Sequence, residues 1–172
     1  KLDQSTIPPV GGMSRVELQV GRVDLANMPA FAPKTEVDLL RQYLNKDHAY
    51  RHKQLTAPAR GLIDDHFNVF GGEAFAVNGW RNFIPLLGQS TVANLDWVST
   101  LGTQSYLWAY GTGPGSYTGA SGVGNTNDFA ANDFRAIFTM LFGSYHGDWD
   151  SQNNFLRAPL AGATHGLACA WA

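Results

Sequence analysis

The chain has 172 residues and a formal net charge of −2, with 44% hydrophobic and 15% charged residues. So few charges on so apolar a chain exclude intrinsic disorder, which requires the opposite balance. Basic residues are scarce in the second half, where residues 82–172 contain only Arg135 and Arg157. We therefore expect no nucleic-acid partner, because phosphate backbones are bound by a cationic protein surface.

The chain contains no apolar run that approaches the roughly 18 residues of a membrane span, so we expect no span. It starts at Lys1 and stops at Ala172 inside an apolar run, from which we expect a fragment or processed product of a longer chain. Cys169 is the single cysteine, which excludes an intrachain disulfide. Its alanine neighbours favour a buried core side chain.

The elements begin after a short lead-in. Residues 1–14, with paired prolines and paired glycines, predict irregular structure. Residues 15–172 are expected to form a single domain whose C-terminal part is truncated. Within it, Val16, Leu18 and Val20 alternate with polar residues, which is the period of a strand.

The first helix is expected to follow Thr35. Asp38 stands three residues further on, where the second member of a helix-capping box is found. The periodicity of the apolar residues predicts a helix to about His52. Its expected buried face consists of Val37, Leu40 and Leu44, with Leu39 and Tyr43 beside them.

The remaining elements alternate between strand and helix patterns. We expect strands at 62–63, 104–111, 136–142 and 166–172, and helices over 74–87 and 155–160. The apolar runs at 136–142 and 166–172 are typical of strands buried on both faces. This alternation predicts an α/β sandwich with a mostly parallel sheet.

Ligands and catalytic groups in such a sheet lie at the carboxyl ends of the strands. Three predicted strand ends carry polar or glycine-rich sequences. They are the aspartates at 64–65, the glycine-rich segment 111–116, and the segment 143–150. We expect the chemistry of the protein at these positions.

Short motifs occur in a recognisable order along these elements. They are Val20-Gly21-Arg22-Val23, then Leu44-Asn45-Lys46 and Ala49-Tyr50, Ile63-Asp64-Asp65, Tyr110-Gly111-Thr112-Gly113 followed by Ser116, Gly143-Ser144-Tyr145-His146-Gly147, and finally the segments 155–161 and 166–171. Over residues 15–172 this order resembles the gingipain-type cysteine peptidases, which have a caspase-like fold. The resemblance implies a three-layer sandwich around a mostly parallel sheet, in an extracellular or cell-surface protein.

The catalytic dyad of that family is substituted in this chain. The resemblance places Thr112 at the position of the histidine and Ser144 at the position of the cysteine. A threonine hydroxyl is no general base near neutral pH, and a serine hydroxyl is much harder to deprotonate than a thiol. We therefore expect an inactive peptidase-like domain of a larger secreted or surface protein, with a structural or binding role.

An active hydrolase is the alternative. Ser144 would then act as nucleophile with His146, or with a histidine supplied from elsewhere. Residues two apart share a face only in extended backbone, so a solvated loop histidine is the competing interpretation of His146.

The segment around Trp149 is the best remaining ligand feature. Asp148 and Asp150 flank this tryptophan, a combination that favours a cationic group. The oxygen-rich sequence does not match an EF-hand, but it leaves open a calcium-stabilised extracellular module. The alternative is that the two aspartates turn the chain. We expect no other cofactor and assign no metal ligands.

Two weaker patterns are set aside. His48 and His52 share a helix face, but the basic residues beside them favour a solvated last turn over a metal site. The glycine segment 111–116 lacks the spacing and the lysine of nucleotide-binding loops. The expected partners are a peptide or protein ligand, or further copies of the chain associating through sheet edges.

Overall fold

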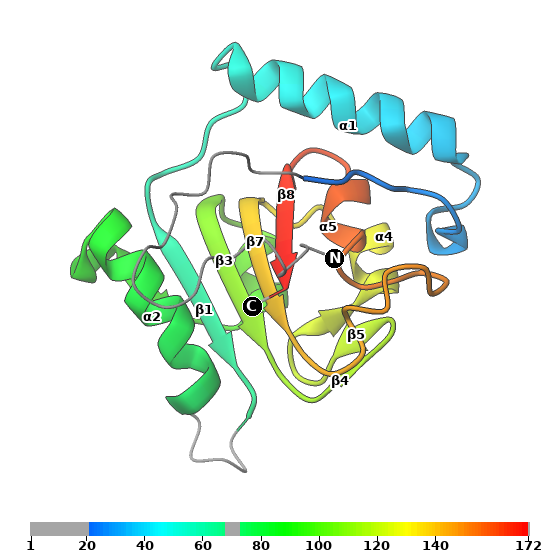
Figure 1. Cartoon of the computed structure of the whole chain (residues 1–172). Helices are drawn as coiled ribbons and strands as arrows, with labels where there is room; N and C mark the ends of the chain where they lie inside the picture. Colours follow the sequence, from blue (N-terminus) through cyan, green and yellow to red (C-terminus); the bar gives the residue numbers. More distant parts are fainter. Residues whose placement is uncertain (1–20, 68–72, 172) are drawn as a thin grey trace, which may run out of the picture.

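Figure 1 shows the computed structural model of the chain, which describes residues 21–67 and 73–171. The strand predicted from Val16 to Val20 lies outside the described residues. The other predicted strands and helices are present within a residue or two of their expected positions, although the helix predicted over 155–160 is shorter.

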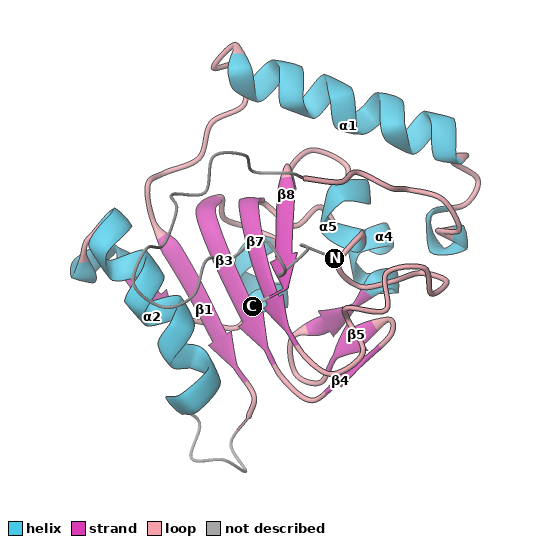
Figure 2. Cartoon of the chain, in the orientation of Figure 1, coloured by secondary structure: helices cyan, strands magenta, loops and turns pink. Residues whose placement is uncertain are grey.

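In the part of the chain that the structure describes, a five-stranded parallel sheet forms the centre (Figure 2). Its strands stand in the order β2-β1-β3-β7-β8, and every neighbouring pair is parallel. The strands are β1 (Gly61–Asp65), β2 (Val92–Asn94), β3 (Tyr106–Thr112), β7 (Ala136–Phe142) and β8 (Ala168–Trp171). The predicted α/β architecture with a mostly parallel sheet is thus confirmed.

Helices cover both faces of this sheet. On one face, α2 (Glu73–Leu87) packs on β1 and β3. The helix can approach closely because Gly79 has no side chain there. A Cβ on Gly79 would lie 2.4 Å from the ring of Tyr110. The opposite face is covered by α3 (Trp97–Leu101), α4 (Thr126–Ala131) and α5 (Ala158–Ala161), whose large side chains join one core cluster. The chain therefore forms a three-layer sandwich, as predicted.

Two short 3-10 helices also occur among the described residues. They are η2 (Pro29–Phe31), which precedes the first long helix, and η4 (Gln89–Thr91), which leads into β2. None of the helices in the described part of the chain has the length and apolar character that a membrane span requires.

The first long helix, α1 (Glu36–Arg51), begins as the sequence predicts. Thr35 Oγ1 accepts a hydrogen bond from Asp38 N at 3.2 Å, and Asp38 Oδ2 accepts one from Thr35 N at 3.0 Å. The predicted buried face is wrong, however. Val37, Leu40 and Leu44 are 61%, 41% and 56% exposed.

The side of α1 that docks is instead polar. Lys46 is buried, and its Nζ lies 2.6–3.2 Å from four backbone carbonyl oxygens. These belong to the end of α5 and the segment after it, at Leu160, Gly162, His165 and Gly166. Gln42 and Tyr43 also donate to carbonyls of this segment. Burial lowers the pKa of Lys46 to about 7. Hydrogen bonds to the backbone, which residue periodicity does not predict, therefore orient this helix.

The glycine-rich segment after β3 forms a small antiparallel sheet rather than an open loop. Its strands are β4 (Gly115–Ser116), β5 (Gly119–Ala120) and β6 (Gly124–Asn125). The chain folds back tightly on itself here. A Cβ on Gly113 would lie 2.3 Å from the carbonyl oxygen of Ser121, so no larger residue fits at this position. Glycine provides this close backbone approach.

The last strand is not the buried strand that the apolar sequence predicts. In the described part of the chain β8 is an edge strand, and Ala168, Ala170 and Trp171 are exposed. Cys169 is half-buried against the main core, and burial raises the pKa of its thiol to about 12. Association of copies through the edges β2 and β8 remains a prediction.

Candidate functional site

The three strand ends singled out in the sequence converge at one edge of the sheet. His66 N, just after β1, donates to Thr112 O at 2.8 Å. Gly113 N, just after β3, donates to Phe142 O at 3.1 Å. The segments after β3 and β7 also touch, since a Cβ on Gly115 would lie 2.4 Å from Ser144 N. Parallel pairing brings these ends together.

Thr112 and Ser144 occupy this edge in different environments. Thr112 is fully buried and is in register with Phe142, the last residue of β7. Ser144 follows two residues later and is exposed. The two positions thus lie at the ends of adjacent strands, one enclosed and the other facing solvent.

His146 points into the protein and not toward Ser144. Its side chain is fully buried, its Nε2 lies 3.2 Å from Gly119 O, and its ring packs edge-on against Phe155. Burial lowers the pKa of His146. The backbone between the two residues is not extended, because Tyr145 has a φ of 67°. No hydrogen bond joins Ser144 to His146 in the described structure.

The three candidate residues around Trp149 lie in different environments. Asp148 and Asp150 are exposed, whereas Trp149 is half-buried against the main core. Within the part of the chain that the structure describes, no group of three or more His, Cys, Asp or Glu side chains is placed to hold a metal ion. A cationic ligand at this segment therefore remains a prediction that depends on exposed carboxylates.

Two buried polar side chains hold this loop in place, and sequence reasoning missed both. Asn154 is fully buried and donates to His146 O at 2.9 Å and to Asp148 O at 3.1 Å. The Arg157 side chain is 2% exposed. Its guanidinium donates to the carbonyl oxygens of Ala26 at 2.6 Å and Ser151 at 2.5 Å. The loop after β7 is thus organised from inside.

A carboxylate and an imidazole lie together at the end of β1. Asp64 Oδ1 is 2.8 Å from His66 Nε2, and Asp64 Oδ2 accepts a hydrogen bond from Trp97 N at 2.9 Å. Burial raises the pKa of Asp64, while the Trp97 N–H and His66 oppose that rise. The side chain of Asp64 is 6% exposed and that of His66 is 34% exposed. We call these two residues the Asp64–His66 pair.

One glycine makes room for the imidazole. A Cβ on Gly122 would lie 2.2 Å from the ring of His66. Gly122 also has a φ of +82°, a conformation that favours glycine. Sequence reasoning identified Asp64 as a strand end but missed His66; the available signal was a histidine directly after the two aspartates.

A hollow adjoins the pair on the side of the small sheet. It has a volume of about 530 Å³. Its wall, which we call the glycine pocket, consists of Val98, Pro114, Gly115, Ser116, Gly119, Ala120, Ser121, Gly122, Gly124 and Asn125. Gly122 belongs to this wall and also packs against His66, but neither Asp64 nor His66 lines the pocket itself. The wall contains no lysine or arginine.

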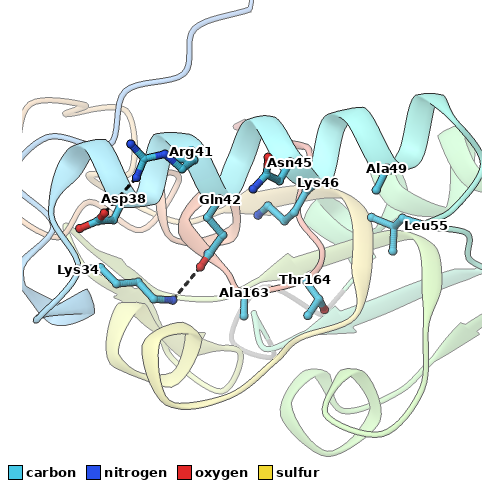
Figure 3. Close-up of a pocket in the computed structure, with 10 residues that line it drawn as sticks. All are labelled: Lys34, Asp38, Arg41, Gln42, Asn45, Lys46, Ala49, Leu55, Ala163 and Thr164. Atoms are coloured by element: carbon cyan, nitrogen blue, oxygen red, sulfur yellow. Dashed lines mark hydrogen bonds and ion pairs between the residues drawn. The ribbon is translucent and has the colours of Figure 1, made fainter.

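A second hollow, of about 630 Å³, lies between α1 and residues 163–164 (Figure 3). Its cations are already engaged. Lys34 Nζ donates to Gln42 Oε1 at 2.7 Å, Arg41 is 3.5 Å from Asp38, and Lys46 donates to backbone carbonyls. Because α1 lies beyond the amino ends of the strands (Figure 1), this hollow is remote from the strand ends described above.

The strand order places the pair at a position of general significance. In the order β2-β1-β3-β7-β8, the direction of chain progression reverses between β1 and β3. Open α/β sheets bind ligands at the carboxyl ends beside such a reversal.

Comparison of the chain with protein-family models, with curated proteins and with solved structures found no match.

Proposed function

We propose that this chain is a peptidase-like domain of a larger secreted or surface protein that binds a peptide segment carrying a basic side chain, without cleaving it through Ser144. The resemblance to gingipain-type peptidases supports the class of protein and its location. The observation that carries the binding role is the glycine pocket, which opens beside the converging strand ends.

The wall of the pocket suits an extended peptide. It is formed largely by the short strands β4, β5 and β6, whose side chains are small. In the described sheet β4 and β6 are edge strands. Edge strands bind peptides through main-chain hydrogen bonds, while neighbouring pockets accept alternate side chains.

The charges around the pocket favour a basic ligand. Asp64 and Asp65 end β1, and Asp96 caps α3, the helix that contributes Val98 to the wall. Of the two arginines after residue 82, Arg157 is buried and bonded to carbonyl oxygens, and the exposed Arg135 stands at the amino end of β7, away from the carboxyl ends of the strands. A surface with carboxylates and without accessible cations attracts positively charged groups.

The environment of Ser144 supports binding without cleavage at that residue. A serine hydroxyl needs a base within hydrogen-bond reach to become a nucleophile. Ser144 is exposed, and His146, the nearest histidine in sequence, is turned into the core. A serine-directed fluorophosphonate probe should therefore leave Ser144 unmodified; stoichiometric labelling of this residue, located by mass spectrometry, would contradict the proposal.

A titration with capped peptides tests the binding role. We expect a lysine- or arginine-containing peptide to bind more tightly than the same peptide with glutamate at that position, as measured by isothermal titration calorimetry. Ser116→Trp, which fills the pocket, should abolish binding. Ser90→Trp is the matched control, because Ser90 is exposed at the amino end of β2. Equal binding by both variants, or no binding of any peptide by the unmodified chain, would refute the proposal.

A further inference from the structure

The end of α1 brings two exposed histidines together. His48 lies in the last turn of the helix, and His52 is its C-cap residue. His52 N donates to His48 O at 3.0 Å, so the two residues stand one helical turn apart on the same face. Their ring centroids are 4.2 Å apart, with an angle of 38° between the ring planes. Because both residues are exposed, the paired imidazoles are accessible from solvent.

This spacing is the one with which a helix chelates a metal ion. Two histidines at positions i and i+4 present ring nitrogens to one point beside the helix, as in the helical motif that binds zinc. A zinc–nitrogen bond measures about 2.0–2.1 Å. Rings that are already in contact can therefore bind one ion after small side-chain rotations, without any change in the helix backbone.

The charges beside the two histidines oppose a cation less than the sequence indicates. Arg51 and Lys53 are their basic neighbours in the chain. In the structure Arg51 Nε lies 2.7 Å from Asp47 Oδ2, so a carboxylate compensates this guanidinium. Lys53 lies beyond the helix, where the chain leaves the helical path with a φ of 59°. The carbonyl groups at a helix C-terminus carry partial negative charge, which favours a positive ion at this end.

We propose that His48 and His52 bind one divalent ion of the late transition metals, the class of Ni²⁺, Cu²⁺ and Zn²⁺. Water completes the coordination, because among the described residues no third histidine, cysteine, aspartate or glutamate joins the two in a metal-binding group. Structural zinc sites, in contrast, are closed by four protein ligands. A site with two protein ligands and open positions exchanges its ion with solvent.

The ligand atoms determine the class of metal. Imidazole nitrogen suits zinc, copper and nickel, whereas magnesium and calcium take oxygen ligands. The nearest carboxylate in sequence, that of Asp47, is paired with Arg51. We therefore expect Cu²⁺ to bind more tightly than Ni²⁺ or Zn²⁺, following the general order of affinity for divalent metals, and Mg²⁺ not to bind.

A metal ion at this position should stabilise α1. The ion binds two side chains that only the helix holds one turn apart, so it binds the folded chain better than the unfolded chain. The site lies on α1, beyond the amino ends of the strands (Figure 1). It is therefore separate from the glycine pocket, and the inference does not depend on the proposed function.

Isothermal titration calorimetry of the full chain with NiCl₂ tests the site. We expect one Ni²⁺ per chain. His48→Gln and His52→Gln should each lower the affinity by at least about tenfold, since even the loss of an outer-shell partner costs about 10–100-fold. His66→Gln is the matched control, because it removes a partly exposed histidine from another part of the fold and should leave the affinity unchanged. MgCl₂ should give no binding heat.

A spacing variant separates chelation from unspecific binding to surface histidines. The double substitution His52→Gln with Lys53→His keeps the number of histidines but removes the i and i+4 spacing. Circular dichroism should show this variant to be folded, because both positions are exposed. NiCl₂ should raise the Tm of the unmodified chain and leave that of the double variant unchanged.

Three results would overturn the inference. The first is the absence of Ni²⁺ binding by the unmodified chain. The second is an equal affinity for Ni²⁺ in the unmodified chain and in the double variant. The third is a loss of affinity in His66→Gln as large as that in His48→Gln. Binding of the basic peptide is measured separately and without metal, so failure of the metal site is distinguishable from failure of the proposed function.

Discussion

The ends of β1 and β7 use histidine in opposite ways. At the end of β7, His146 is fully buried and contacts Gly119 O and Phe155. At the end of β1, the side chain of His66 is 34% exposed, and its Nε2 lies 2.8 Å from Asp64 Oδ1. The difference shows that a histidine near a strand end becomes available for chemistry only where the following backbone leaves its ring at the surface.

The polar groups that organise the two ends differ in the same sense. The loop after β7 is fixed from within, by Asn154 and Arg157, whose side chains satisfy carbonyl oxygens. The end of β1 is fixed by one carboxylate and by close glycine packing. The β7 end should therefore dominate stability, and the β1 end should tolerate substitution.

Arg157→Met provides the largest expected effect. The substitution removes a buried guanidinium and leaves the carbonyls of Ala26 and Ser151 without their donor, while Asp24 loses a partner 3.6 Å away. We expect the free energy of unfolding in urea to fall by about 3 kcal/mol or more. Arg135→Met is the control, since the Arg135 side chain is 42% exposed and its Nε lies as far as 3.8 Å from Asp133 Oδ2. A similar loss in both variants would contradict the comparison.

Asn154→Ala should have the next largest effect. Its amide serves two carbonyls of the loop, and its Oδ1 accepts from Leu156 N at 3.0 Å. Loss of these bonds inside the protein should cost about 2 kcal/mol in chemical denaturation. Asn132→Ala, which removes a single exposed bond to Asp128 O, should change stability much less. An unaltered denaturation midpoint for Asn154→Ala would show that the loop does not depend on this side chain.

Mild acid should weaken the β7 end. Burial lowers the pKa of His146 below its ordinary value of 6.5, and the pKa of His165 is lowered in the same way. The unfolded chain therefore binds protons first as the pH falls, and stability decreases from about pH 6.5 downward. Urea denaturation at pH 7.5, 6 and 5 should reveal this slope, and His146→Gln should flatten it. A slope that is identical in the variant would exclude His146 as its source.

His66→Gln should have the smallest effect on stability. The imidazole is partly exposed, and its Nε2 makes no hydrogen bond although it lies 2.8 Å from Asp64 Oδ1. We expect a change of less than about 1 kcal/mol, close to the range for partly exposed pairs. A loss as large as that of Asn154→Ala would mean that the Asp64–His66 pair is a structural contact.

Helix α1 shows where residue patterns succeed and where they fail. The capping box of Thr35 and Asp38 was predictable, because it depends on neighbouring residues alone. The buried face was not, since it depends on what lies opposite the helix. Lys46 donates hydrogen bonds to four backbone carbonyls there, whereas Val37 and Leu44 remain exposed.

The candidate site divides in the same way. The apolar strand β7 and the glycine-rich segment after β3 marked two of the strand ends from the sequence. The proximity of Asp64, His66 and Gly122 was not predictable, because Gly122 stands 56 positions after His66 and the fold alone brings them together.

Local sequence thus determined which segments are strands and helices and where α1 starts, because the period of the apolar residues and helix capping depend on a few neighbouring residues. The alternation of these strands and helices in turn predicted a mostly parallel sheet. Tertiary structure alone decided which side of α1 is buried, which histidine faces solvent, and that β8 is an exposed edge among the described strands. Burial and hydrogen-bond partners come from residues distant in sequence, so these properties follow only from the assembled fold.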